Sequence, residues 1–237
     1  MDWFTSVVSC CEAIPLDTLP LRPLLALCKV LLAGYRLLYA DGLICRVLSD
    51  DMGGNMRKLE SALQAMEVAA VEDRKRSQPS PTGSGRSCSS LPGLGYDPAV
   101  GAYFGDLSTY FPEASAEGIY GARWITRILR FVTLLLQQLG SQPELSISLA
   151  GRATYTQVIA PFHAPVMSWV VKCVLYWAPS RAWVLKHSLG GASNEAASAA
   201  CLRAAAALGP LAQACHAHLE SRGLNYPDLI SAVPGGF

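Results

Sequence analysis

Residues 118–140 read GIYGARWITRILRFVTLLLQQLG, and this stretch decides the class of fold. Its apolar residues recur every three or four positions, as at Leu129, Val132, Leu136 and Leu139, which is the spacing of one face of an α-helix. Working outward, the same periodicity predicts further helices, and no stretch has the pattern of a sheet. These helices are expected at 5–14, 19–48, 52–74, 145–177, 179–189 and 194–222. The sequence therefore predicts an all-α protein.

The composition is apolar for a protein that lacks a membrane-spanning segment. Hydrophobic residues make up 51% of the 237 residues and charged residues only 16%. A spanning helix needs roughly 18 or more apolar residues in succession, but the apolar stretch 19–48 carries Arg22, Lys29 and Arg36, and prolines interrupt the uncharged run 153–171. No basic segment precedes an apolar core at the N-terminus, so we expect no secretory signal and a cytoplasmic location. The apolar excess then points to an apolar cavity or surface.

The eight cysteines and the net charge exclude two classes of protein. The cysteines are scattered singly, apart from Cys10–Cys11, and no CxxC pair or zinc spacing occurs. We therefore expect reduced, mostly buried thiols and no bound metal. The net charge of +1 provides no electrostatic footprint for nucleic acid.

The segment 74–100 differs from the rest of the chain in composition. It is rich in Ser, Gly, Pro and Arg and has almost no apolar periodicity. Such a segment cannot bury enough apolar surface to offset its ordering entropy, which favours a mobile loop. The helices on either side are too few to close separate cores. We therefore expect one domain over 1–237 with a mobile insertion at about 74–100.

A first candidate site lies in the run DDMGGNMRK at 50–58. Asp51, Asn55 and Lys58 are spaced so that all three project from one side of a helix. One interpretation is a helix N-terminus with a solvated polar face. The other is a polar patch for a ligand with many hydroxyls, since Asp accepts hydrogen bonds, Lys donates them and the Asn amide does both.

Two further candidates lie in apolar segments. Trp124, Arg127 and Phe131 share a helix face, and a Trp among arginines is either a core residue or a flat ring facing a polar ligand. His163 follows Tyr155 by eight residues. It is either a core histidine with its hydrogen bonds satisfied or the one polar partner in an apolar wall.

The sequence contains no catalytic motif. It has no GxSxG elbow, no HExxH, no phosphate-binding glycine loop and no paired carboxylates in an apolar setting. We therefore expect no enzyme, no catalytic residue and no cofactor.

Together the three candidate sites resemble the glycolipid transfer protein family. The family pattern is Asp, three residues, Asn, two residues, Lys; then a Trp that begins W-hydrophobic-x-R-x-L-R-F; then a His eight residues after a Tyr. The residues that match are Asp51, Asn55, Lys58, WITRILRF at 124–131, Tyr155, His163 and the C-terminal Leu224-Asn225-Tyr226, similar to the family's final LNY. The resemblance extends from about residue 4 to Tyr226, except over 74–118.

The resemblance implies a two-layer helical sandwich with ceramide chains buried between the layers. It implies that Asp51, Asn55 and Lys58 bond sugar hydroxyls, with Asp51 also reaching the ceramide amide N–H. Trp124 would stack on the sugar, His163 would bond the amide carbonyl, and Tyr226 would help to close the site. The protein would then carry one glycosphingolipid, or another sphingolipid, between membranes that it contacts transiently. No protein partner is indicated.

The resemblance leaves alternatives open. One family branch binds ceramide-1-phosphate and has Arg at the stacking position; Trp124 favours sugar, while Arg57, Arg123, Arg127 and Arg130 keep phosphate open. A sphingolipid sensor or adaptor is the other alternative. The family often has an aromatic residue two positions after the His, near the membrane-contacting surface. Here that residue is Pro165, and Trp169 or Trp177 could replace it.

Overall fold

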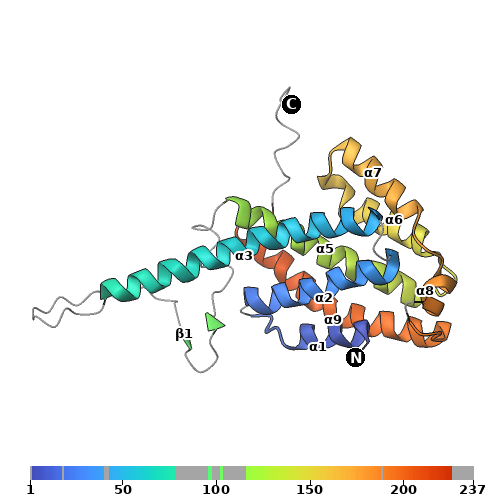
Figure 1. Cartoon of the computed structure of the whole chain (residues 1–237), viewed down its shortest axis with the longest axis horizontal. Helices are drawn as coiled ribbons and strands as arrows, with labels where there is room; N and C mark the ends of the chain where they lie inside the picture. The colour runs from blue at the N-terminus through green and yellow to red at the C-terminus, as the bar shows by residue number, and fades with distance from the viewer. Residues whose placement is uncertain are drawn as a thin grey trace, which may run out of the picture.

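In the residues that it describes, the computed structural model is helical apart from one antiparallel pair of two-residue strands (Figure 1). It describes residues 2–17, 19–39, 43–77, 96–97, 102–103, 116–187 and 189–225. The elements are α1 (Trp3–Glu12), α2 (Leu21–Tyr39), α3 (Leu43–Ser77), β1 (Tyr96–Asp97), β2 (Ala102–Tyr103), α5 (Ala116–Ser141), α6 (Ile147–Val158), the 3-10 turn η1 (Ala160–Phe162), α7 (Pro165–Tyr176), α8 (Arg181–His187) and α9 (Asn194–Ser221). The all-α prediction is confirmed, with the antiparallel pair β1–β2 as a small exception.

Helix α5 is the centre of the molecule. Every residue from Gly121 to Leu129 is buried, as expected for a helix that other helices surround. Helices α9 and α3 pack on α5, and α1 and α2 pack in turn on α9 and α3. Helices α6 and α7 cover the remaining side, while the C-terminal part of α3 extends beyond the body (Figure 1).

The boundary between the second and third helices differs from the prediction. Helix α2 ends at Tyr39 and α3 begins at Leu43, whereas the sequence predicted helices at 19–48 and 52–74. Gly34 lies inside α2, where the Trp3 indole packs on it. A Cβ at this position would lie 2.8 Å from the indole ring.

The predicted helix at 145–177 is divided into α6, η1 and α7. Proline has no backbone N–H to continue a helix. Pro161 lies in η1 and Pro165 is the first residue of α7, so the chain turns between them. This turn places His163, in extended conformation, between two helices rather than within one.

Other boundaries follow the sequence. Gly190 and Gly191 have φ values of +61° and +79°, which glycine adopts readily, and they separate α8 from α9. The Ser193 side chain then accepts the N–H of Ala196 and caps α9. The predicted insertion at about 74–100 is helical as far as Ser77 and contains β1, and its other residues lie outside the described ranges.

Cys10, Cys11, Cys28, Cys173, Cys201 and Cys215 are free thiols. Cys11, Cys28, Cys201 and Cys215 are buried. Burial raises the pKa of the Cys201 thiol to about 11, so this thiol stays protonated at neutral pH. Across the described ranges, no helix is both long enough and apolar enough to cross a bilayer.

Candidate functional site

Four predicted site residues line one cavity of about 80 Å³, here called the proximal cavity. They come from α3, α5, α6 and the turn after η1. They are Asp51, Trp124, Tyr155 and His163. The rest of the lining is apolar apart from Tyr35. Residues more than a hundred positions apart thus meet at one cavity.

His163 is held between two aromatic side chains. Its Nδ1 lies 2.8 Å from the Tyr155 hydroxyl, and its ring centroid lies 4.8 Å from that of Trp124, at an angle of 31°. Tyr155 comes from α6, and the turn at the prolines returns the chain so that His163 faces it. The eight-residue spacing therefore reflects a direct hydrogen bond across this turn.

Tyr155 is 1% exposed and remains a neutral hydroxyl at physiological pH. Burial raises its pKa, the negative charge of Asp51 adds to the rise, and a hydrogen bond with Ser168 opposes it. A neutral phenol can donate to or accept from the imidazole. Tyr155 therefore fixes the orientation of the His163 ring and influences which ring nitrogen carries the proton.

Asp51, Asn55 and Lys58 lie in the interior of α3. Because α3 begins at Leu43, the interpretation of these residues as a helix N-terminus is wrong. Asn55 is only 4% exposed, and its amide donates to the backbone carbonyl of Asp51 at 3.0 Å. Burial raises the pKa of the Asp51 carboxyl and the ammonium of Lys58 opposes the rise, although the residue as a whole is exposed. The carboxyl group is thus partly enclosed by protein.

Gly121 lets α3 approach α5 at this site. A Cβ on Gly121 would lie 2.8 Å from the Asn55 carbonyl oxygen and 3.2 Å from the Lys58 Cβ. These distances are too short for any side chain without movement of the α3 backbone. Gly121 was not among the predicted site residues, and its position three residues before Trp124 is its only signal in the sequence.

Cationic and aromatic groups surround Trp124. The Lys58 ammonium lies 4.0 Å from the centroid of the Tyr120 ring, which is 6.1 Å from that of Trp124. The Arg127 guanidinium carbon lies 3.7 Å from the Phe162 ring centroid and 5.0 Å from that of Trp124. These are cation–π distances. Tyr120 and Phe162 are therefore parts of the site that the motif spacing did not reveal.

Buried polarity in the described chain is concentrated on α3, α5 and α6. The buried polar and charged residues are Asn55, Arg123, Thr126, Arg127 and Thr154. In addition, the Trp124 Nε1 donor is buried and has no hydrogen-bond partner in the described part of the chain. Buried polar groups are costly unless they are paired, so this concentration points to a function.

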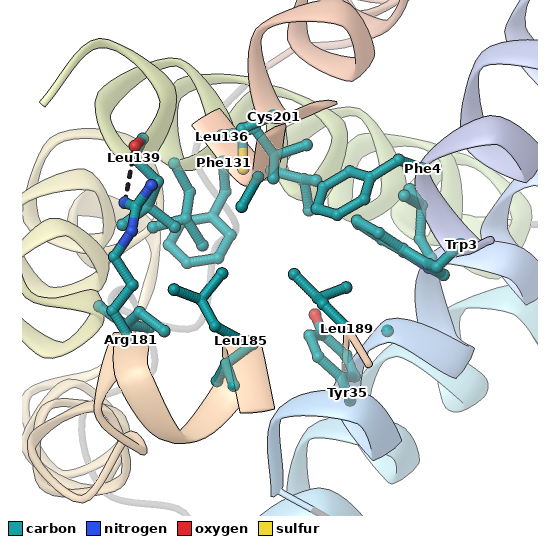
Figure 2. Close-up of a pocket in the computed structure, with 17 residues that line it drawn as sticks. Trp3, Phe4, Tyr35, Phe131, Leu136, Leu139, Arg181, Leu185, Leu189 and Cys201 are labelled. Carbon is teal, nitrogen blue, oxygen red and sulfur yellow. Dashed lines mark hydrogen bonds between the residues drawn. The ribbon is translucent and has the colours of Figure 1, made fainter. Parts of the chain in front are cut away.

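A second cavity of about 120 Å³, the distal cavity, continues from the proximal one. Tyr35, Phe131, Leu135 and Ile147 line both cavities. In Figure 2 the side chains of Tyr35, Leu185 and Leu189 face those of Phe131 and Phe4 across the distal cavity. Apart from Tyr35 and Arg181, the lining is apolar. Arg181 donates hydrogen bonds to Leu139 O, Asn194 and Ser198.

The remaining predicted residue, Tyr226, lies outside the described ranges. The described ranges contain no group of three His, Cys, Asp or Glu side chains arranged as metal ligands. The arrangement that is present can bind an amphiphile. Hydrogen-bonding groups line the proximal cavity, the Arg127 guanidinium lies against Trp124, and apolar walls line the distal cavity.

Comparison with known proteins identifies the fold. The mouse ceramide-1-phosphate transfer protein superposes with a TM-score of 0.68 at 16% identity, over 96% of this chain and 100% of that one. The fungal glycolipid transfer protein HET-C2 gives 0.67 at 15% identity, over 91% and 95%. The human ceramide-1-phosphate transfer protein, in complex with ceramide-1-phosphate, gives 0.65 at 17% identity, over 95% and 98%.

These identities are low, and no curated protein matches the sequence. The model of the family described as Glycolipid transfer protein (GLTP) does match, over residues 107–189. That range contains Trp124, Tyr155 and His163. The resemblance predicted from the sequence is thus confirmed: residues 107–189 match the glycolipid transfer protein family, and the chain has the fold of that family.

Proposed function

We propose that this protein binds one sphingolipid, a glycosphingolipid in the first place, and carries it between membranes without chemical change. The observation that carries the proposal is the pair of adjoining cavities, one polar at its rim and the other apolar. A sphingolipid has the same division between a polar head group and hydrocarbon chains. The solved structures of the same fold are named as transfer proteins for such lipids, which supports a carrier rather than an enzyme.

The head group is assigned to the residues around the proximal cavity. Asp51 would accept from the ceramide amide N–H and from sugar hydroxyls, and Lys58 would donate to them. His163, oriented by Tyr155, would bond the amide carbonyl. Asn55 would contribute its amide oxygen, since one N–H of its amide already donates to Asp51 O.

Trp124 has two possible contacts with a sugar. His163 and Arg127 lie against the indole, which is 4% exposed, so stacking requires the sugar to take the place of a neighbouring group. The buried N–H of Trp124 is a donor that a sugar hydroxyl would satisfy. We therefore assign Trp124 a hydrogen bond to the head group in addition to the stacking expected from the sequence.

Affinity and selectivity would come from different parts of the lipid. Each buried methylene contributes about 0.8 kcal/mol, so the chains supply most of the binding free energy. A net hydrogen bond contributes about 0.5–1.5 kcal/mol, and a similar amount is lost when a buried polar group stays unpaired. Discrimination among lipids is therefore expected to depend on the few polar residues at the proximal cavity.

The exposed face of α7 is proposed as the surface that contacts the membrane. Trp169 and Trp177 are 68% and 72% exposed, and Val166 is 76% exposed. The opposite face of α7, through Val171 and Leu175, lines the proximal cavity. A bilayer that accepts the exposed tryptophans would therefore lie next to the lipid site, and this contact would be transient. The cytoplasmic location expected from the sequence stays a prediction.

Ceramide-1-phosphate is the alternative ligand, and one observation favours it. Arg123 and Arg127 are 4% and 3% exposed. Arg127 lies against the Trp124 ring, while Arg123 and Lys58 lie over the neighbouring Tyr120 ring. Arginine is the preferred partner of phosphate because it can donate two parallel hydrogen bonds. Against this, the negative charge of Asp51 at the same cavity would repel a phosphate.

A transfer assay between vesicles tests the proposal. We expect glucosylceramide to move faster than ceramide-1-phosphate, and phosphatidylcholine not to move. Trp124→Arg should slow glucosylceramide and speed ceramide-1-phosphate, because it adds charge and removes the indole. A wild type that prefers the phosphate would overturn the choice of head group. No transfer and no binding of either lipid would overturn the proposed function as a whole.

A further inference from the structure

The two cavities adjoin along a shared wall. The shared wall consists of Tyr35 from α2, Phe131 and Leu135 from α5, and Ile147 from α6, because these four side chains line both cavities. The volumes are about 80 Å³ and about 120 Å³. Sites for drug-sized ligands measure about 300–1,000 Å³, so neither compartment alone would hold a long lipid chain.

Tyr35 differs from the other members of the shared wall. Phe131 and Ile147 are 9% and 7% exposed and belong to the buried core between α5 and α6. Tyr35 is half-buried and is held from α2, at the edge of that core. It is also larger than Leu135. The Tyr35 ring can therefore be removed while the core between α5 and α6 stays in place, and it is the largest side chain of the shared wall for which this is true.

The distal cavity is suited to hydrocarbon. Its one charged lining residue, Arg181, directs its guanidinium to Leu139 O, Asn194 and Ser198 and away from the cavity (Figure 2). An apolar cavity stays dry and binds apolar ligands. A chain whose head group lies at Trp124 and His163 would fill the proximal cavity first and reach the distal one only past the shared wall.

From this geometry we propose that Tyr35 determines the acyl-chain length that the protein prefers. With the ring in place, a short chain fits the proximal cavity, and a longer chain must displace the ring to continue. Without the ring, the two cavities merge and each further methylene gains apolar contact. This inference rests on the proposed function, because it assumes that a sphingolipid occupies the proximal cavity.

The experiment compares glucosylceramides that carry an octanoyl, a palmitoyl or a tetracosanoyl chain. Their binding to wild type and to Tyr35→Ala is measured in competition by native mass spectrometry. Each methylene newly buried changes affinity about fourfold. We therefore expect the ratio of tetracosanoyl to octanoyl binding to rise at least about tenfold in Tyr35→Ala, which corresponds to about two methylenes. Leu135→Trp, which narrows the passage, should lower the same ratio.

Two control variants enlarge one cavity without joining it to the other. Leu136 lines only the distal cavity and Leu175 only the proximal one, so Leu136→Ala and Leu175→Ala leave the shared wall complete. Tyr35→Leu, a smaller change, is measured beside Tyr35→Ala, and circular dichroism confirms that each variant is folded.

The results separate this inference from the proposed function. If wild type and both Tyr35 variants bind glucosylceramide with the same chain-length profile, the role of Tyr35 is wrong while the carrier function stands. The role of Tyr35 is also wrong, and the carrier function still stands, if Leu136→Ala shifts the chain-length profile as strongly as Tyr35→Ala does. If wild type binds none of the three glucosylceramides, the assignment of a glycosphingolipid fails, and this inference fails with it.

Discussion

Asp51 is proposed to bind the head group, and the burial of its carboxyl has a cost in stability. Burial raises the pKa of its carboxyl in the folded protein, so the ionised form is less favoured there than in the unfolded chain. A carboxyl with a raised pKa lowers stability at neutral pH, and the stability returns as pH falls through the raised value. We therefore expect Asp51→Asn to raise the melting temperature at pH 7 and to slow glucosylceramide transfer at least about tenfold, since it removes a charged acceptor. Thermal unfolding and vesicle transfer measure the two effects.

The pH dependence provides a second readout of the same substitution. The gain in stability from Asp51→Asn should shrink as pH falls through the raised pKa towards the ordinary aspartate value of about 3.9. Glu60→Gln is the matched control, because this carboxylate pairs with Lys29 on the far side of α3 from the cavity. If Asp51→Asn is less stable than wild type at pH 7 and transfers lipid normally, then neither the stability cost of the buried carboxyl nor the role of Asp51 in transfer holds.

At the scale of the element, α7 has two apolar faces with different partners. One face lines the proximal cavity and the other exposes Trp169, and Trp177 is exposed at the C-cap of the helix. We expect Trp169→Ser with Trp177→Ser to reduce vesicle binding and transfer about tenfold, because each Trp loses apolar area that enters the interface. Val68→Ser is the control, since Val68 is a 59% exposed residue of α3. Co-sedimentation with vesicles measures the first effect. If the double variant binds vesicles and transfers lipid as wild type does, α7 is not the docking surface.

The elements also show how far the sequence could lead. The period of α5 and the common face of Asp51, Asn55 and Lys58 are local properties, and both are present in the structure. The start of α3 at Leu43 was missed because residues 19–48 keep one helical period, which outweighed the turn signal Asp41-Gly42 directly before Leu43. The contact of Gly121 with α3, and the place of Tyr35 between two cavities, depend on helices far apart in the chain, which periodicity cannot bring together.

At the scale of the whole molecule, the core in the described ranges comes from residues before 78 and after 115. Residues 78–95 are rich in Ser, Gly and Pro, and we propose that folding and lipid binding do not depend on their sequence. Replacement of 78–95 by a Gly-Ser linker of equal length should leave the melting temperature and the transfer rate almost unchanged. Leu129→Ala, at a fully buried position of α5, is the control and should lower the free energy of unfolding by about 2–5 kcal/mol.

The two measurements on this replacement separate the single-domain account from the sensor alternative. Loss of cooperative unfolding would mean that 78–95 belongs to the fold, and the interpretation as an insertion would be wrong. Normal stability and lipid binding with slow transfer would mean that the segment acts on a membrane or a protein partner, as a sensor or adaptor would require. If stability, lipid binding and transfer all stay at wild-type levels, residues 78–95 are dispensable. The carrier would then need only α5 and the helices that surround it, with α3, α6 and α7 supplying the lipid site.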